Sequence, residues 1–442
     1  MTANPESGRN RLILCFDGTW NTPEDHTNVF RLYAAIPDRS SGCPDQLKFY
    51  DEGVGTSLGT KISGGAFGLG LDENMLKGYC WLIQHYQPGL GRPKLVELPA
   101  TVISEPPGPP VVEPGPQSFE DGDQIFAFGF SRGAFTARSL SGMINRCGIL
   151  RLDGFATPAA VTTDHPLIRQ AWNLYRKTLD GAQADGRKIP TRNLAECEAF
   201  RQQHAWVPKV RFVGVWDTVG ALGVPAFNGT NLPFSPARFR FHDTSLGRVI
   251  DNGYHACAID ENRPDFAVTL WSAKSHPGQQ VEQRWFPGAH ANVGGGYEDD
   301  TLPDPPMKWL AERAIACGME FRKDFLGTDP NRCAMALPRD FELMGNEYLA
   351  PVRDSYKEFA YGLYAPLSDL KALLGGGHFD GRLYRPMLIY GINEVIDDSA
   401  TLKLSRDSDY HPPNLAHAGR DDLNAAEIRR LDNPAATYGE GE

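Results

Sequence analysis

Residues 124–144 have the sequence QIFAFGFSRGAFTARSLSGMI, which contains the clearest signal of the predicted fold. Its first part, QIFAF, is a short apolar run of strand length, whereas AFTARSLSGMI has helical periodicity. A strand therefore turns sharply into a helix at GFSRG. Strands that alternate with helices in this way predict an α/β fold, with a mainly parallel sheet flanked by helices.

The rest of the chain continues this alternation. Further strands are predicted where apolar, β-branched or aromatic residues gather, and further helices where apolar residues recur on one face. The predicted strands cover 11–16, 46–50 and 210–216, and the predicted helices cover 72–86, 134–145 and 304–325. One or two more strands are expected within 379–400. We therefore predict a single α/β domain over residues 1–442.

Two segments interrupt the pattern. Residues 88–117 contain EPPGPPVVEPGP, and because proline is excluded from helix interiors and central strands, we expect an inserted surface loop. Residues 155–206 separate two predicted strands and look mostly helical. They predict a helical cap packed over one end of the sheet.

Composition and charge exclude several classes of protein. The chain of 442 residues is 41% hydrophobic, enough to bury a large core. Lys and Arg number 44 against 55 Asp and Glu, and this net charge of -11 does not suit a nucleic-acid partner. The eight cysteines are widely spaced, which argues against a zinc knot or a dense disulfide scaffold. No signal-peptide core or apolar run of about 18 residues is visible, so we expect a protein that is cytoplasmic as synthesised.

The turn GFSRG matches the GxSxG pattern of a nucleophile elbow. In such an elbow Gly129 and Gly133 let the backbone turn tightly, and the Oγ of Ser131 is exposed for attack. The alternative is an ordinary strand-to-helix turn in which the glycines serve packing and Ser131 only caps the helix. Because a strand precedes the motif and a helix follows it, we favour a nucleophile.

A serine nucleophile needs a base, and the base needs an acid that orients it. Asp217 directly follows the strand VRFVGVW, at the carboxyl end where active-site loops lie, although an Asp at this place can also cap a turn. His290 lies in PGAHANVGGGY, a loop whose glycines allow close approach of the backbone. The other histidines, such as His255 in the helical-looking YHACAIDENR, are interpreted as packing residues. The chain order Ser131, Asp217, His290 is that of α/β-hydrolase triads.

The oxyanion of an acyl-transfer intermediate needs hydrogen-bond donors. We expect one from the backbone N–H of Arg132, the residue after the nucleophile, and a second from Gly18 or Thr19 in the loop after the first strand. Asp17 begins the same loop. It either holds the loop by accepting backbone hydrogen bonds, which we favour, or ligates a metal.

The remaining motifs predict no cofactor and no metal. Asp17, Asp51, Asp72, Asp217 and His290 offer hard ligands, but neither an HExxH motif nor compact spacing is present. The glycine-rich GGAFGLG and HANVGGGY match neither GxxxxGK[ST] nor a GxGxxG that follows a strand. Nucleotide binding is therefore not expected.

Several motifs lie in order along the chain. They are FDGTWN (16–21), GVGT (53–56), GLDEN (70–74), GFSRGAFTARSLSGMI (129–144), WDTVGALG (216–223), DENRPDF (260–266), PGAHANVGGGY (287–297) and a weaker YHPPNL (410–415). This series resembles the α/β-hydrolase family typified by the phospholipase effectors of bacterial type VI secretion. The proline-rich segment looks like an insertion between the family's helix and its strand GDQIF.

The resemblance implies a serine hydrolase of fatty-acyl esters, first of all glycerophospholipids, with Ser131 as nucleophile, Asp217 as acid and His290 as base. It also implies a lipid or acyl-ester substrate, peripheral membrane contact, export by type VI secretion to a target cell, and secretion-apparatus and immunity proteins as partners. The alternatives are a soluble carboxylesterase acting on small esters, a metal-dependent phosphoesterase using Asp17 and Asp217, and a non-catalytic interaction module.

Overall fold

The structure is a computed structural model. It describes residues 9–18, 21–39, 43, 45–53, 66–88, 95–97, 101–103, 111–113, 117–119, 122–180, 191–220, 245–298, 300–322, 333–334, 337–338, 341–358, 369 and 382–419.

A seven-stranded sheet forms the centre of the molecule, and every pair of neighbouring strands in it is parallel. The strand order is β17-β14-β12-β10-β7-β1-β2. The bounds are β1 (Arg11–Phe16), β2 (Gln46–Asp51), β7 (Gln124–Phe130), β10 (Val210–Trp216), β12 (Asn252–Ala258), β14 (Gln280–Phe286) and β17 (Glu394–Ile396). The predicted mainly parallel α/β sheet is confirmed.

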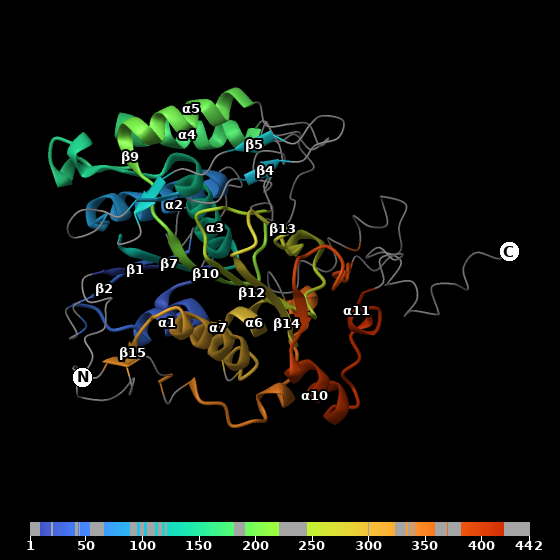
Figure 1. The fold of residues 1–442 in the computed structure, drawn as a ribbon. Helices are drawn as coiled ribbons and strands as arrows, with labels where there is room; N and C mark the ends of the chain where they lie inside the picture. The colour runs from blue at the N-terminus through green and yellow to red at the C-terminus, as the bar shows by residue number, and fades with distance from the viewer. Residues whose placement is uncertain are drawn as a thin grey trace.

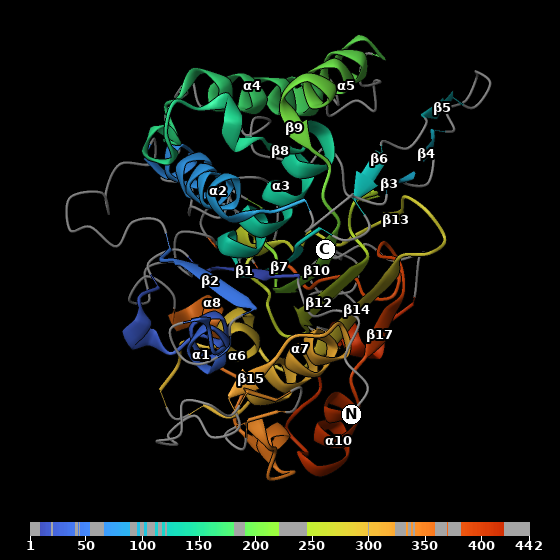
Figure 2. The same cartoon turned by 60° about the vertical axis from the view of Figure 1, so that its left-hand side comes forward.

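Helices cover both faces of this sheet (Figures 1 and 2). One face packs against α2 (Ala66–His85) and α3 (Arg132–Cys147), and the other packs against α1 (Asn28–Ala35) and α7 (Asp304–Ala316). Because both faces of the central strands are buried, their sequences are continuous apolar runs instead of alternating ones. No helix in the described part of the chain is long and apolar enough to span a lipid bilayer.

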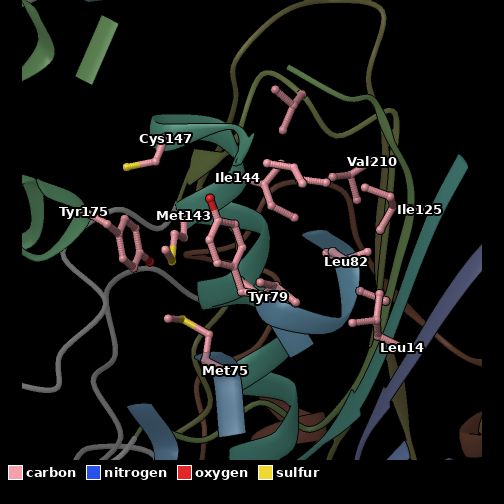
Figure 3. Packing of buried hydrophobic residues seen from close by; sticks show 14 of the residues in the cluster. Leu14, Met75, Tyr79, Leu82, Ile125, Met143, Ile144, Cys147, Tyr175 and Val210 are labelled. Atoms are coloured by element: carbon pink, nitrogen blue, oxygen red, sulfur yellow. The ribbon is translucent and has the colours of Figure 1, made fainter. Parts of the chain in front are cut away.

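The larger core lies between the sheet and the α2–α3 layer (Figure 3). Leu14, Ile125 and Val210 extend from neighbouring strands toward the two helices. Tyr79 of α2 is fully buried, and its hydroxyl donates to the carbonyl of Gly148, 2.9 Å away, just beyond the end of α3. This packing fixes α3, and therefore its first residue, relative to the strand that precedes it.

The helices predicted as a cap are α4 (Pro166–Asp180) and α5 (Thr191–His204). They form an outer layer beyond α2 and α3 (Figure 1). Cys147 Sγ lies 3.3 Å from the carbonyl of Ala171, and Arg201 donates to the carbonyl of Asn145, so both helices contact the C-terminal end of α3. Helices α4 and α5 of the predicted cap thus pack against the end of α3 opposite Ser131.

The proline-rich segment contains regular structure that the sequence did not predict. Strand β3 (Leu95–Glu97) pairs with β6 (Gln117–Phe119), and β4 (Thr101–Ile103) pairs with β5 (Val111–Glu113), all antiparallel. The two ladders extend away from the sheet (Figure 2). The short strands fit between the prolines of the inserted segment, where no residue of a ladder has to be a proline.

The segment around His255 is strand β12, although its sequence looks helical. Nearly every residue of β12 is buried, so the period-2 alternation that marks a half-exposed strand is missing. The predicted helix 304–325 ends at Ala316 because Gly318, at φ 100°, takes a conformation that continues no helix.

The remaining elements connect or extend this framework. The short paired strands are β8 (Ile149–Leu150) with β9 (Ala205–Trp206), β11 (Ser245–Leu246) with β13 (Ala273–Lys274), and β15 (Phe321–Arg322) with β16 (Cys333–Ala334). The short helices are α6 (His290–Gly294), α8 (Ser355–Glu358), α10 (Asp398–Arg406), α11 (Pro413–Ala416) and the 3-10 turns Pro23–Asp25, Leu152–Gly154, Pro158–Ala160, Pro264–Phe266 and Glu347–Leu349.

Candidate active site

The strand order has a topological switch point at the carboxyl ends of β1 and β7. From β1 the chain continues to β2 on one side, whereas from β7 it continues to β10 on the other, so the connections leave in opposite directions. Ligands of open parallel sheets bind at such a switch point. Asp17 follows β1, Ser131 follows β7 and Asp217 follows β10, which places the three predicted residues at this edge.

Ser131 lies on a sharp turn between β7 and α3, with φ 57° and ψ -120°. An L-residue rarely adopts this conformation, and its backbone N–H donates to the carbonyl of Trp216 at 3.0 Å. The two flanking glycines are required because there is no space for a side chain at either position. A Cβ on Gly129 would overlap the carbonyl of Gly133, and a Cβ on Gly133 would overlap the carbonyl of Phe16 at the end of β1.

Ser131, His290 and Asp217 form a continuous chain of hydrogen bonds. The Oγ of Ser131 lies 2.7 Å from Nε2 of His290, and Nδ1 of His290 lies 2.5 Å from Oδ2 of Asp217. The three residues come from the ends of three different strands, β7, β10 and β14. Asp217 is fully buried, whereas Ser131 and His290 each keep 6% of their surface exposed. The structure therefore brings together the three residues that the sequence singled out.

Asp217 has a further partner that the sequence analysis missed. Arg385 donates from Nη1 to Oδ1 at 2.6 Å and from Nη2 to Oδ2 at 3.0 Å, and the N–H of Ala258 donates to Oδ1 at 3.0 Å. Burial by itself would raise the pKa of Asp217, but the charge of Arg385 and the hydrogen bond from His290 outweigh it and hold that pKa below its ordinary value. The carboxylate stays ionised. The only signal in the sequence was a lone arginine within the apolar LYRPMLIY, since a buried charge needs a partner.

The imidazole of His290 is enclosed by aromatic rings. The ring of Phe130 lies 4.7 Å from it and the ring of Phe266 lies 5.2 Å from it, edge-on, centroid to centroid. Burial lowers the pKa of His290 below its ordinary value, and the hydrogen bond to Asp217 offsets only part of this effect. A neutral imidazole near pH 7 can accept a proton from Ser131.

A second buried ion pair supports His290 from the other side. Glu261 binds Arg263 through both carboxylate oxygens, at 2.8 Å from Nε and 2.7 Å from Nη2. Its Oε2 also accepts from the backbone N–H of His290 at 3.2 Å and from the hydroxyl of Ser355 at 3.1 Å. Burial opposes ionisation, but Arg263 lowers the pKa of Glu261 to about 2. Glu261 belongs to the motif DENRPDF, whose pattern alone indicates no role for it.

The predicted oxyanion donors differ in their surroundings. Arg132 is the first residue of α3, so its N–H belongs to the positive end of a helix. Gly18 donates its N–H to Oδ1 of Asp17 at 2.7 Å, which gives it an acceptor other than the expected oxyanion. Thr19 lies outside the described residues.

Asp17 accepts three hydrogen bonds in this loop, from Gly18, from the hydroxyl of Thr27 at 2.6 Å and from the hydroxyl of Tyr50 at 2.8 Å. Burial raises the pKa of Asp17 to about 6. Within the ranges that the structure describes, no three His, Cys, Asp or Glu side chains gather into a set of metal ligands.

Strand order and a serine on a sharp turn after β7 define an α/β-hydrolase-like domain. The model of the catalytic domain of Tle1-like phospholipase effectors of the type VI secretion system (T6SS) matches residues 10–91 and 116–313. These residues make up more than half of the chain, and the protein belongs to this family. The gap in the match falls within the proline-rich segment.

The individual proteins that this chain resembles share only low sequence identity with it. An uncharacterized protein of Saccharomyces cerevisiae is 26% identical over 284 residues, which cover 60% of this chain and 33% of the yeast protein. An uncharacterized protein from Pseudomonas aeruginosa with a known crystal structure has 15% sequence identity to this chain and a TM-score of 0.37. The match covers 83% of this chain and 53% of the Pseudomonas protein. The Tle1 effector bound to the VgrG spike of the type VI secretion system is 17% identical, with a TM-score of 0.29, over 67% of this chain and 52% of the other. The chain thus spans a third to about half of these proteins, and one of them comes from a yeast.

Proposed function

We propose that this protein is a serine hydrolase that cleaves fatty-acyl esters, with phospholipids as its substrate class. The observation that carries the proposal is the hydrogen-bonded chain from Ser131 through His290 to the buried Asp217. Membership in the family of Tle1-like phospholipase effectors supports the substrate class.

In the proposed reaction the neutral His290 takes the proton of Ser131 through Nε2 while Oγ attacks the ester carbonyl. Asp217 holds Nδ1 of the imidazole and stabilises the imidazolium that forms. The backbone N–H of Arg132 donates to the oxyanion. His290 then protonates the leaving alcohol, and the acyl group stays on Ser131. In the second half of the cycle His290 activates water, which hydrolyses the acyl-enzyme and restores Ser131.

Labelling by a fluorophosphonate followed by peptide mapping tests this reaction. We expect modification of Ser131 in the wild type and none in Ser131→Ala. Without a base the labelling rate should fall by about 10²–10⁴-fold in His290→Ala. Ser141→Ala is the matched control, because this buried serine of α3 only donates to the carbonyl of Ala137. Unchanged labelling of the Ser131→Ala variant would refute the assignment.

Two substrate classes can be separated by kinetics. A phospholipase should gain activity when its substrate passes from monomers to micelles or vesicles, whereas an esterase for small esters should work on monomers alone. The runner-up, a soluble carboxylesterase, is favoured if dispersed short-chain esters are cleaved and vesicles are not. Unchanged turnover after exhaustive chelation would count against a metal-dependent phosphoesterase.

We propose partners on the same basis. Family membership supports peripheral contact with a lipid surface, export by a type VI secretion apparatus, and inhibition by an immunity protein. The Tle1 effector of the solved structure is bound to a VgrG spike. Cosedimentation with phospholipid vesicles tests the first contact, and copurification with a VgrG-type spike protein tests the second.

A further inference from the structure

The C-terminal segment 382–419 reaches the candidate active site, although the family match ends at residue 313. Its strand β17 extends the central sheet by pairing with β14, the strand that leads to His290. In Figures 1 and 2 the segment runs in red beside β14, with which its strand β17 pairs. The structure thus adds to the catalytic region a piece of chain that lies outside the matched domain.

Several hydrogen bonds dock this segment on the loop after β12. The N–H of Leu383 donates to the carbonyl of Asn262 at 2.8 Å. The side-chain amide of Asn414 donates to the carbonyls of Ile259 at 2.8 Å and of Arg385 at 3.2 Å. The hydroxyl of Tyr410 donates to Oδ2 of Asp260 at 3.0 Å. These contacts hold the backbone of Arg385 at a defined place.

Arg385 uses its guanidinium to bind Asp217 and the backbone around it at the same time. Beyond its two bonds to the carboxylate, Nη1 donates to the carbonyl of Ala258 at 2.9 Å and Nη2 donates to the carbonyl of Phe266 at 2.6 Å. Oδ2 of Asp217 also receives the bond from Nδ1 of His290. The planar guanidinium therefore fixes the orientation of the carboxylate that holds the imidazole.

Two compensated ion pairs contact His290 through its side chain or its backbone. Asp217 follows β10 and binds Arg385, whereas Glu261 follows β12 and binds Arg263. His255, on β12, is buried and accepts from the N–H of Thr218, next to Asp217, and burial lowers the pKa of His255 to about 3, so it stays neutral. With His290 neutral, these groups sum to zero charge. Each carboxylate is thus kept ionised in a buried place, where a lone charge would be very costly.

We infer that Arg385 is a positioning residue of this active site, and that segment 382–419 is a working part of the catalytic unit because it supplies this residue. The inference rests on the proposed function. Arg385 acts through Asp217: its bidentate bonds set the plane of the carboxylate, and the carboxylate sets the imidazole that receives the proton of Ser131.

Arg385 also lines a cavity of about 330 Å³. Its other walls include Arg263, Val268, Leu270, Tyr384 and Tyr390. Removal of the Arg385 side chain would open a path from this cavity to Asp217. A small planar cation such as guanidinium can then enter and bind the carboxylate in place of the missing side chain.

The test compares Arg385→Ala and Arg385→Lys with the wild type. We expect kcat/KM for an acyl ester to fall by about 10²-fold in Arg385→Ala, the cost of a misplaced catalytic group. Guanidinium at sub-denaturing concentration should restore part of this loss, and urea, its neutral counterpart, should not. Arg385→Lys keeps the charge without the bidentate geometry, and we expect a loss of at least tenfold.

The pH at which the acid limb of kcat/KM falls is a second measurement. A purely structural role of Arg385 would leave this pH unchanged. Without the charge of Arg385, the pair of Asp217 and His290 binds its proton more tightly, whichever member takes it, so the limb should move to higher pH in Arg385→Ala. In Arg385→Lys the limb should stay at its wild-type position. Arg201→Ala is the control, because Arg201 is equally buried but contacts the far end of α3.

The outcomes separate the two proposals. Wild-type protein that fluorophosphonate does not label would refute the proposed function itself. If the wild type is labelled and active, but folded Arg385→Ala keeps the wild-type kcat/KM and pH profile, only the role of Arg385 is overturned. The same conclusion follows if urea restores the activity of Arg385→Ala as well as guanidinium does. If Arg385→Ala does not fold, Arg385→Lys decides, and wild-type kcat/KM in that variant would overturn the inference.

Discussion

The conformation of Ser131 predicts that the candidate nucleophile is held at a cost in stability. Its φ of 57° and ψ of -120° lie in a region that glycine enters freely and other residues avoid. We therefore compare two variants that both lack the hydroxyl. Ser131→Ala keeps the Cβ that causes the strain, and Ser131→Gly removes it. The difference in stability between them isolates the backbone strain from the hydrogen bond to His290.

The magnitude follows from two opposing effects. A residue held in such a conformation costs about 1–3 kcal/mol, which glycine relieves. Glycine in turn loses about 0.5–1 kcal/mol through the greater freedom of the unfolded chain. We expect Ser131→Gly to be more stable than Ser131→Ala by about 1 kcal/mol. Unfolding entropy of about 2.1 cal/mol/K per residue gives about 0.9 kcal/mol/K for a chain of this length, so the melting temperatures should differ by about 1 °C.

Scanning calorimetry and urea denaturation of both variants measure this difference. Neither variant should be labelled by a fluorophosphonate, so activity and stability are read independently. Ser131→Val, which adds a β-branched side chain at the same φ, should be the least stable of the three. An alanine variant as stable as the glycine variant would show that the turn carries no strain, and the reasoning from φ and ψ would be refuted.

Three further predictions concern space, proton transfer and charge. Gly133→Ala should destabilise the protein by at least about 3 kcal/mol in urea denaturation, because the added Cβ would overlap the backbone at the end of β1. As a control, Gly154→Ala should change the stability by no more than about 0.5 kcal/mol, because the nearest atom to its Cβ lies 3.4 Å away. Equal effects of the two substitutions would contradict the steric argument. The acid limb of kcat/KM should lie below about pH 6.5, since burial lowers the pKa of His290 and protonated His290 cannot act as base, and a limb well above that pH would contradict it. In the folded protein the pKa of Glu261 is about 2, whereas an ordinary Glu has a pKa of 4.5. The charge of Glu261 therefore contributes about 3 kcal/mol to the free energy of unfolding. This contribution is present above pH 4.5 and is lost as the pH falls toward 2. The deficit of Glu261→Gln in unfolding free energy should therefore shrink over this range, and a deficit of the same size at pH 3 and pH 7 would disprove the linkage.

The elbow could be predicted because its physics is local. Gly129, Ser131 and Gly133 lie within five residues, and the turn that they form depends on the strand before them and the helix after them. Strand β10 was equally clear, since most residues of VRFVGVW are β-branched or aromatic. Asp217 could be selected because it follows a predicted strand, and His290 because it lies in a glycine-rich loop. Where strand signals were weak, as in the almost entirely buried β12, the sequence predicted the wrong element.

Contacts between distant segments were beyond the reach of the pattern. Arg385 meets Asp217 across 168 residues, and Glu261 meets Ser355 across 94. No periodicity marks such a pair, because either residue alone looks like an ordinary charged side chain. The acceptor of Gly18 and the place of the α4–α5 layer were likewise decided by packing.

The sequence was sufficient to predict the strand-and-helix alternation, the sharp turn at Ser131 and the chain order of serine, aspartate and histidine, because backbone geometry and burial follow from neighbouring residues. Which charges share the buried site depends instead on the packing of distant segments. Burial of Asp217 with Arg385 and of Glu261 with Arg263 requires the assembled sheet and, for Arg385, the docked C-terminal segment, because an unpaired charge is very costly to remove from water.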